Sequence, residues 1–435
     1  PIATLSTGGQ DNNFSINYTL KKNENVTIDL FANLADDTQD DTASTASGAT
    51  EAIDATDAFQ TIFMISGTSL ISGAAVTSGD GSTTVAGQTI AFAAATITAT
   101  VDSSSPVAGI TYDNQTVTSA ALKFAAVTAG FNITDLTFTL PAAGATVVSN
   151  VMLYDGAALV ATAPGGAETV TFSGLTWNVP ANTNKVLTVK LQLGSIGVGA
   201  GTTNASLITT LTAFTAVNTS TGVSAAGTES NPAGAALNAF AAIPTIDQVA
   251  LASTLLNNTT ARPLVRFTMT ANGGPIAWDQ LTFKVTDDAT TTVGTNATTG
   301  ITLWDVTNGG NTSVAGTFVN GASVYGAGSC ATPADCDVGF VPTAEQTVAT
   351  SKTYELRGNI AAANAAGDFV TTTLDNDSSA IVASNTVAVI LAADADAPLI
   401  WSDISAASHD TTTTDWTSDF GVKNLPVAGS MNWPS

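Results

Sequence analysis

The sequence predicts an almost entirely β chain built from tandem two-sheet sandwiches, and three observations lead to this fold class. Apolar and polar residues alternate with a period of two in runs such as "ALKFAAV", "LTFTL", "VVSNVMLYD", "ETVTFSGLTW" and "KVLTVKLQL", which is typical of strands with one buried face. Gly, Pro, Asn or Asp bounds each run, as expected at turns. No stretch shows a capped helical period, so no long helix is expected.

The same four elements occur twice in the same order, which divides the chain into modules. The first copy reads "LKFAAVTAGFNITDLTFTL" (122–140), "NVMLYDG" (150–156) and "VPANTNKVLTVKLQL" (179–193). The second copy reads "VRFTMTANGGPIAWDQLTFKV" (265–285), "GITLWDV" (300–306) and "VATSKTYELRGNI" (347–359). The four shared elements are a strand ending in Phe, an "LTF" strand after a short turn, an aromatic-Asp pair (Tyr154-Asp155 and Trp304-Asp305) and a terminal alternating strand.

These repeats place the domain boundaries. Roughly seven strands per copy, with a turn about every 8 to 12 residues, suit an immunoglobulin-like sandwich. We therefore expect one sandwich over 95–240, a second over 241–405, and a C-terminal tail over 406–435. Pro244 marks a short linker, and sandwiches on short linkers favour a rod-like arrangement.

Residues 1–94 have the pattern of a partial N-terminal β-module. The stretch 14–34, "FSINYTLKKNENVTIDLFANL", matches the ends of both later repeats, yet no "LTF" strand precedes it. A partial sandwich leaves apolar faces and edge groups uncovered, so either residues 35–94 complete it or a neighbouring subunit inserts a strand. We expect the intermolecular route, with residues 1–20 or 420–435 as the donor. Head-to-tail donation does not close on itself and gives an open fibre.

The charge and composition favour a location outside the cell. The 435 residues include 35 acidic and 11 basic side chains, and the formal net charge of −24 excludes nucleic acid as a partner. Only 11% of the residues are charged, and Thr, Ser, Ala, Asn and Gly take the place of Lys and Glu. No apolar run is long enough to span a bilayer, and if the protein is exported, the start at Pro1 means that the numbering is that of a processed chain.

Three stretches give the chain a resemblance to a known group of proteins. The run "KVLTVKLQL" after "VPANTNK", the run "NVMLYDG", and "LIWSDISAASHDTTTTDWTSDFGVKNLP" (399–426) resemble the tandem immunoglobulin-like modules of large surface proteins of uncultivated, very small bacteria. The resemblance covers most of residues 95–426. It implies a role in a surface layer or fibre, and it brings no catalytic residues with it.

Two cysteines predict a local disulfide. Cys330 and Cys336 stand six positions apart in "GSCATPADCDVG", and in an oxidising compartment they are expected to pin a hairpin loop. A zinc site would need more Cys or His ligands, and His409 is the only histidine.

Acidic loops are candidates for calcium, although no cofactor is required. Calcium takes oxygen ligands from flexible Asp-rich and Asn-rich loops, and none of the acidic segments fits the EF-hand pattern. The alternative is that these are solvated turns. The preferred ligands flank one sandwich edge: Asp375, Asp377, Asp394 and Asp396.

Asn-x-Ser/Thr sequons are frequent, which predicts glycans on an extracellular coat. An abundance of Asn and Thr alone would also create many of them. The candidate asparagines are Asn17, Asn25, Asn114, Asn132, Asn204, Asn218, Asn258, Asn296, Asn311 and Asn376.

The sequence offers little for catalysis, so we expect a protein that is not an enzyme. His409 lies near Ser405, Ser408 and Asp410, but adjacency in sequence does not build a Ser-His-Asp triad, and no GxSxG elbow is present. Paired carboxylates of the glycosidase type stay open, because acidic residues are numerous. Trp177, Trp278 and Trp304 are expected to be core residues rather than a sugar platform.

Together these features predict a structural subunit of an extracellular homopolymer, either a surface filament or a surface layer, whose partners are copies of itself. The alternative is an adhesin or ligand-binding module of a larger cell-surface protein. A secreted hydrolase is the third hypothesis.

Overall fold

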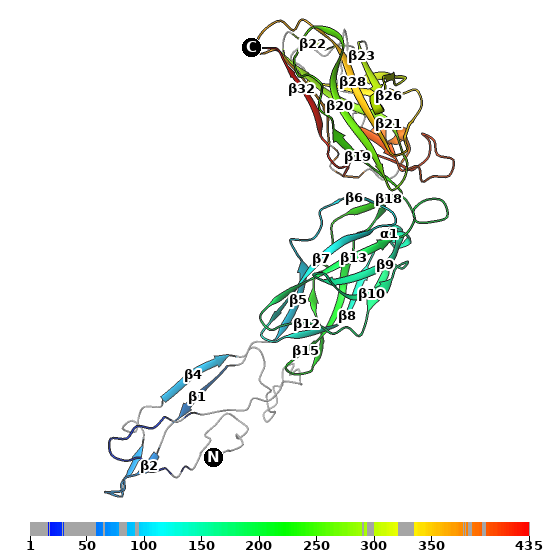
Figure 1. Ribbon diagram of the computed structural model, residues 1–435. Coiled ribbons are helices and arrows are strands. Elements are labelled where there is room, and N and C mark those ends of the chain that lie inside the picture. Colours follow the sequence, from blue (N-terminus) through cyan, green and yellow to red (C-terminus); the bar gives the residue numbers. More distant parts are fainter. Residues whose placement is uncertain are drawn as a thin grey trace.

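The computed structural model describes residues 95–434, apart from 289–290, 294–299, 321–334, 377, 379, 382–384 and 394–396, together with 16, 18–27, 29, 58–63, 66–77 and 85–91 (Figure 1). The described residues are nearly all β, which confirms the predicted fold class. The helical elements among them are short: α1 (Ala142–Val147), α2 (Val387–Ala393) and the 3-10 turn η2 (Thr307–Gly309).

The first sandwich has two main sheets. The six-stranded sheet has the order β10 (Ala158–Pro164), β9 (Val148–Asp155), β13 (Asn184–Leu193), β7 (Thr116–Val127), β5 (Thr96–Val101) and β17 (Thr228–Glu229). The facing sheet has the order β11 (Thr169–Phe172), β8 (Phe131–Thr139), β15 (Thr210–Asn218) and β16 (Ser224–Ala226), with β12 (Trp177–Val179) also paired to β8. A small third sheet contains β14 (Ala205–Ser206), β18 (Leu237–Phe240) and β6 (Gly109–Tyr112).

Alternating residues of these strands fill the space between the sheets. In β13, Leu187, Val189 and Leu191 are fully buried, while the residues between them face outward. Phe124 of β7 meets Trp177 and Phe214 of the facing sheet edge to face, at ring-centroid distances of 5.3 and 5.2 Å. Such aromatic pairs add stabilisation beyond burial of apolar area alone.

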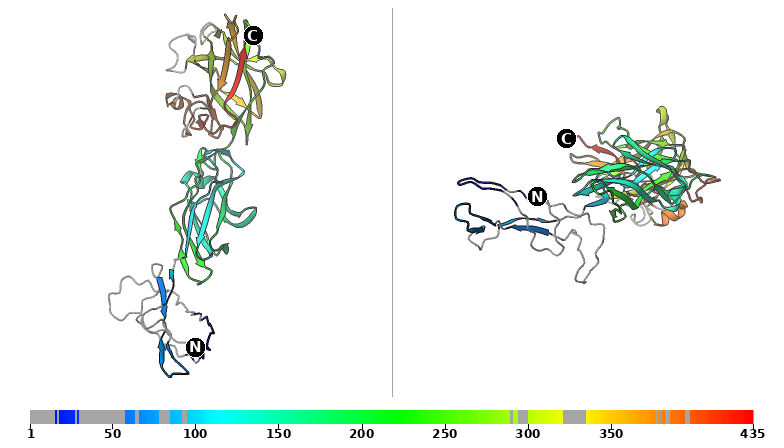
Figure 2. Two further views of the ribbon diagram at one scale, coloured as in Figure 1. Left: turned by 90° about the vertical axis from the view of Figure 1, so that its left-hand side faces the viewer. Right: turned by 90° about the horizontal axis from the view of Figure 1, so that it is seen from below.

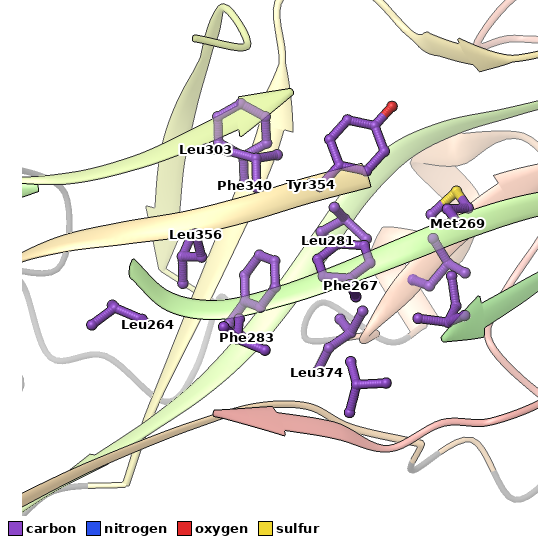
Figure 3. Close-up of a cluster of buried hydrophobic side chains, with 14 of the residues drawn as sticks. Leu264, Phe267, Met269, Leu281, Phe283, Leu303, Phe340, Tyr354, Leu356 and Leu374 are labelled. Atoms are coloured by element: carbon purple, nitrogen blue, oxygen red, sulfur yellow. The ribbon is translucent and has the colours of Figure 1, made fainter. Parts of the chain in front are cut away.

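The second sandwich repeats this plan with a six-stranded and an eight-stranded sheet. One has the order β19 (Ile243–Gln248), β20 (Thr259–Asn272), β28 (Ser351–Ala361), β23 (Ile301–Asp305) and β24 (Thr312–Ser313), with β22 (Thr292–Val293) also on β28. The other has the order β25 (Gly316–Asn320), β26 (Asp335–Pro342), β21 (Ile276–Asp287), β29 (Phe369–Leu374) and β32 (Val427–Asn432), and it includes β27 (Gln346–Val348), β30 (Leu399–Ser402) and β31 (Trp416–Thr417). Figure 3 shows its core, where Phe267, Phe283 and Tyr354 pack between the sheets.

Residues 406–435, expected to be a tail, belong to this second sandwich. β31 pairs with β30, and β32 pairs with β29 along its whole length. Trp416, Val427 and Met431 are fully buried. The tail assignment therefore needs correction, because the alternation in "VAGSMN" was too short to predict a core strand from sequence.

The repeated elements occupy the same places in both sandwiches. β13 lies between β7 and β9, and β28 lies between β20 and β23. Thr188 of β13 is paired with Tyr154, and Glu355 of β28 is paired with Trp304, as the repeat implies. On the other side, Thr188 faces Ala121 whereas Glu355 faces Arg266, so "LKF" and "VRF" are offset by two residues in the ladders.

The two sandwiches meet end to end and share a buried junction (Figure 2). Ile110 and Phe240 of the first sandwich belong to the core cluster of the second, where Phe240 packs on Trp401 at 5.0 Å between ring centroids. The buried Asp403 carboxylate accepts hydrogen bonds from Thr203 Oγ1 at 2.6 Å and from the backbone N–H of Ala241 at 2.8 Å. Burial raises the pKa of Asp403, and these donors partly oppose that effect.

The described strands before residue 95 form two separate ribbons. β1 (Ala58–Phe63) pairs with β4 (Val85–Ala91), and β2 (Ser66–Thr68) pairs with β3 (Ala75–Thr77). Both sheets are two-stranded. A two-stranded ribbon alone is at best marginally stable in water, because three or more strands or a packed face are normally needed.

Candidate functional site

An apolar segment before the ribbons is a candidate assembly surface. We define it by Ile16, Tyr18 and Leu20, whose side chains are 51%, 55% and 54% exposed. Their spacing of two would place all three on one side of an extended strand. Tyr18 has one polar contact, donating from its hydroxyl to Glu24 Oε1 at 3.3 Å. Sequence alternation alone predicted this strand pattern, and the structure adds that these apolar side chains are exposed.

The C-terminal segment, the other predicted donor, is already used within its own chain. β32 pairs with β29 from Val427 to Asn432. At Gly429 an added Cβ would come within 1.9 Å of the Leu264 carbonyl oxygen, so β32 also lies tightly against β20. Residues 420–435 are thus not a free strand, and residues 1–20 remain as the predicted donor.

The aromatic-Asp pair of the first sandwich makes two charge contacts, one at the inner side of its sheet and one on the outer face. Lys185 Nζ lies 2.5 Å from Asp155 Oδ2, and Trp177 Nε1 donates to the same oxygen at 3.0 Å. These donors, Lys185 first, hold the pKa of Asp155 below its usual value. Lys190 Nζ lies over the Tyr154 ring, 4.4 Å from its centroid, which is a cation-π contact.

The second sandwich places equivalent contacts at equivalent positions. Lys352 Nζ lies 3.7 Å from Asp305 Oδ2, and the Arg357 guanidinium lies 4.5 Å from the Trp304 ring centroid. Trp304 is therefore half-buried on the outer face under Arg357, whereas Trp177 and Trp278 are core residues as predicted. Lys185 and Lys190 recur as Lys352 and Arg357 with the same odd spacing, which places the two cations of each strand on opposite faces of the sheet.

His409 lies in a polar cluster that its sequence neighbours did not predict. Its Nδ1 is 2.9 Å from Asp415 Oδ2, and its Nε2 is 3.3 Å from Glu345 Oε2. The ring stacks on Trp416 at 5.1 Å. Among the described residues, Ser405 donates its hydroxyl to Asp403 rather than to His409. The Ser405, Ser408 and Asp410 group is therefore not brought together around the imidazole.

Two carboxyl groups near this cluster have pKa values shifted in opposite directions. Burial, followed by the nearby Glu345 charge, raises the pKa of Asp279 to about 6. The pKa of Asp415 is lowered although burial opposes this, because Thr413, the Ala406 N–H and His409 favour its charged form. The Asp279 shift depends on burial and on Glu345, which is distant in the chain, whereas the Asp415 shift depends on near neighbours in sequence whose side chains and backbone the loop folds around it.

The calcium and disulfide predictions fall largely outside the described residues. Asp377, Asp394, Asp396 and Cys330 lie there, whereas Asp375 is described, and so is the backbone of Cys336 in β26. In the part of the chain that the structure describes, no three His, Cys, Asp or Glu side chains gather as metal ligands. Both the calcium site and the Cys330–Cys336 disulfide therefore stay predictions.

The predicted glycan sites differ in how their amides are used. Asn17 and Asn296 lie outside the described residues. The Asn258 amide forms two hydrogen bonds, from Nδ2 to the Ala363 carbonyl and from the Ala363 N–H to Oδ1, each 2.9 Å. A glycan on Nδ2 would disturb this pair. The exposed candidates are Asn25, Asn114, Asn258, Asn311 and Asn376, while Asn132, Asn204 and Asn218 are half-buried.

Comparisons with known proteins do not place the chain in a family, and the solved structures that align with it do so with low TM-scores. No protein family and no curated protein matches the chain. Among solved structures, the C-terminal domain of the Streptococcus agalactiae AgI/II polypeptide BspA aligns over 64% of this chain and 94% of its own, at 9% identity and a TM-score of 0.17. The CupB6 tip adhesin of Pseudomonas aeruginosa aligns over 59% and 84%, at 11% identity and a TM-score of 0.17.

A third solved structure, the Enterococcus faecalis MSCRAMM ACE, aligns over 75% of this chain and 92% of its own, at 9% identity and a TM-score of 0.15. TM-scores this low do not carry a function across, so the fold class rests on the sheets themselves. No helix in the described ranges has the length and apolar character needed to cross a bilayer.

Proposed function

We propose that the chain is a structural subunit of an extracellular homopolymer, a filament or a layer on the cell surface. Subunits assemble through contacts between β-sandwiches and by strand donation. The observation that carries the proposal is the apolar segment, in which Ile16, Tyr18 and Leu20 alternate and are all about half exposed. Exposed apolar side chains at strand spacing are the pattern that a donated strand needs.

The two-stranded ribbon β1–β4 is the proposed acceptor in a neighbouring copy. A third strand would supply backbone hydrogen bonds to an open edge of that ribbon. Each copy gives its segment to one neighbour and receives a segment from another, which leaves the chain of subunits open. Exchange between only two copies would instead close a dimer.

The joined sandwiches support this role because they provide a stiff spacer between assembly points. Phe240, Trp401 and Asp403 fix the junction, so we propose that the subunit behaves as a rod. The strongly negative charge makes loose contacts between copies unfavourable. Backbone hydrogen bonds in a donated strand do not depend on side-chain charge.

The experiment introduces a charge on the apolar side of the segment. In the full chain, Tyr18→Asp combined with Leu20→Asp should abolish polymers, because two carboxylates cannot enter an apolar strand position without a large desolvation cost. The readouts are electron microscopy and light scattering on purified protein. Truncating 424–435 is a poor test, because it removes the whole of β32 and damages the second sandwich.

Thr19→Asp is the matched control. Thr19 is exposed in the same segment but would lie on the opposite side of a strand, so polymers should still form. The melting temperature of the sandwiches should be unchanged in both variants. Normal polymers from the Tyr18/Leu20 variant, or equal loss in the Thr19 variant, would overturn strand donation.

The alternative function, an adhesin or ligand-binding module of a larger surface protein, is favoured by one specific feature. This feature is a groove over β20 and β28 that contains two arginines.

A further inference from the structure

All three arginines of the chain lie on two neighbouring strands of the second sandwich. Arg262 and Arg266 are on β20, and Arg357 is on β28. Arg262 is used structurally, since its Nη2 donates to the carbonyls of Ser253 and Leu255. Arg266 and Arg357 instead line an open groove of about 520 Å³ on the outer face of the sheet. The other lining residues are Val249, Thr268, Val306, Gly309, Gly310, Asn311 and Thr353.

A buried carboxylate holds these two guanidinium groups in place. The Glu355 side chain is only 1% exposed, and both of its oxygens are used. Arg266 donates from Nε to Oε2 at 2.7 Å and also from Nη2, while Arg357 donates from Nε to Oε1 at 2.5 Å. Arg357 is further fixed by stacking on Trp304. The groove therefore has pre-oriented guanidinium groups at its floor.

These groups keep hydrogen-bonding capacity and a positive charge. Among the described residues, Arg357 forms no hydrogen bond from either Nη, and Arg266 forms none from Nη1. The side chains are 29% and 16% exposed for Arg266 and Arg357, so ligands can reach them. One Glu355 against two arginines leaves a net charge of about +1 at the groove. The nearby Lys352 is balanced by Asp305.

The first sandwich lacks this arrangement at the corresponding ladder positions. Ala121 stands where the second sandwich has Arg266, and Thr188 stands where it has Glu355. The scaffold therefore folds without the Arg266–Glu355 pair. Lys190, in the place of Arg357, supplies a point charge rather than a planar fork. The groove chemistry is thus an addition to a shared sheet and not a requirement of the fold.

We propose that this groove binds the carboxylate of an acidic saccharide. A monoanion would neutralise the site, whereas a dianionic phosphate would leave excess negative charge in a chain that is already strongly acidic. Planar guanidinium groups match the geometry of a carboxylate. The volume lies in the range of small-molecule sites, and the hydroxyls of Thr268 and Thr353 can bond sugar hydroxyls, while Val249 and Val306 offer apolar surface to ring carbons.

This binding does not depend on assembly, so it is tested on full-length protein kept monomeric by Tyr18→Asp with Leu20→Asp, or on polymer if that variant still assembles. Calorimetric titration compares glucuronate, galacturonate and N-acetylneuraminate with neutral glucose, acetate and inorganic sulfate. At least one acidic sugar should bind about tenfold or more tightly than glucose and acetate, because the carboxylate and the ring both contribute. Saturation of the groove by sulfate with higher affinity would overturn the carboxylate assignment.

Substitutions locate the site. Arg266→Lys and Arg357→Lys each keep a positive charge beside Glu355 but lose the planar fork, so each should weaken acidic-sugar binding about tenfold or more. Lys190→Ala, at the position equivalent to Arg357 in the first sandwich, should leave binding unchanged. Unchanged affinity in both arginine variants, equal binding of acetate, or no binding of any acidic sugar would overturn the proposal.

Discussion

The two sandwiches share one strand plan but differ in where they place their carboxyl groups, at the surface in one and buried in the other. In the first, Asp135 lies at the surface of β8, and hydroxyl donors, Thr215 first and at 2.6 Å, lower its pKa. In the second, Asp279 of β21 is buried and its pKa is raised to about 6. Similarly, Thr188 sits where Glu355 is buried beneath two arginines. The same strand plan therefore accepts a neutral hydroxyl, Thr188, or a buried carboxylate, Glu355, at the equivalent ladder position. Burying a carboxylate costs desolvation energy, and the second sandwich carries that cost.

Breaking the junction should give the largest effect. Trp401→Ala removes a fully buried indole that packs on Phe240 and donates from Nε1 to the Ser418 carbonyl at 2.8 Å. We expect a loss of about 4 kcal/mol in the unfolding free energy of the second sandwich. In calorimetry the second sandwich should then melt separately and below the first.

Trp177→Ala is the matched control for that experiment. It removes a buried tryptophan of the first sandwich, away from the junction, and should lower the stability of that sandwich instead. If Trp401→Ala lowered the melting temperatures of both sandwiches equally, the predicted separation of the two transitions would be wrong.

The opposite pKa shifts predict opposite pH dependence. Because the pKa of Asp279 rises from 3.8 to about 6 on folding, the folded state binds the proton more tightly. The stability from Asp279 is therefore fully present below about pH 4 and is lost as pH rises toward 6. Asp279→Asn should stabilise the second sandwich at pH 7 by about 2 kcal/mol and flatten this pH dependence.

Asp135→Asn provides the comparison in the first sandwich. The folded-state pKa of Asp135 is lowered, so its contribution is present above its unfolded pKa and is lost on acidification. The Asn variant should therefore weaken the first sandwich at neutral pH and change little in acid. Urea unfolding at several pH values measures both variants, and effects of the same sign would contradict the comparison.

The smallest expected difference concerns the cation-π contacts. Lys190→Met should cost about 0.5 kcal/mol, because the contact with Tyr154 lies on the outer face. Arg357→Met should cost more, because it also removes a donor from the buried Glu355 carboxylate. Thermal melting measures the stability loss in each variant. Equal losses would mean that the Arg357–Glu355 hydrogen bond does not contribute to the stability of the second sandwich.

Strand alternation and the internal repeat predicted most of the fold because they are local signals. They could not set the exact ladder, since moving "VRF" by two residues relative to "LKF" keeps every side chain on the same face. The junction was equally invisible, because Phe240 is far in sequence from Trp401 and Asp403. For the groove, the sequence places Glu355 and Arg357 two residues apart on one strand, and strand pairing is needed only to bring Arg266 beside them.

The connection between the sandwiches has a consequence for a subunit under load. Only Ala241 and Ala242 separate β18 from β19, and two residues span about 7 Å even when fully extended. The linker therefore holds no slack that could lengthen under tension. Tension applied to one sandwich is transmitted directly to the other through the Phe240–Trp401 contact and the Asp403 hydrogen bonds. This part of the chain therefore bears load without lengthening.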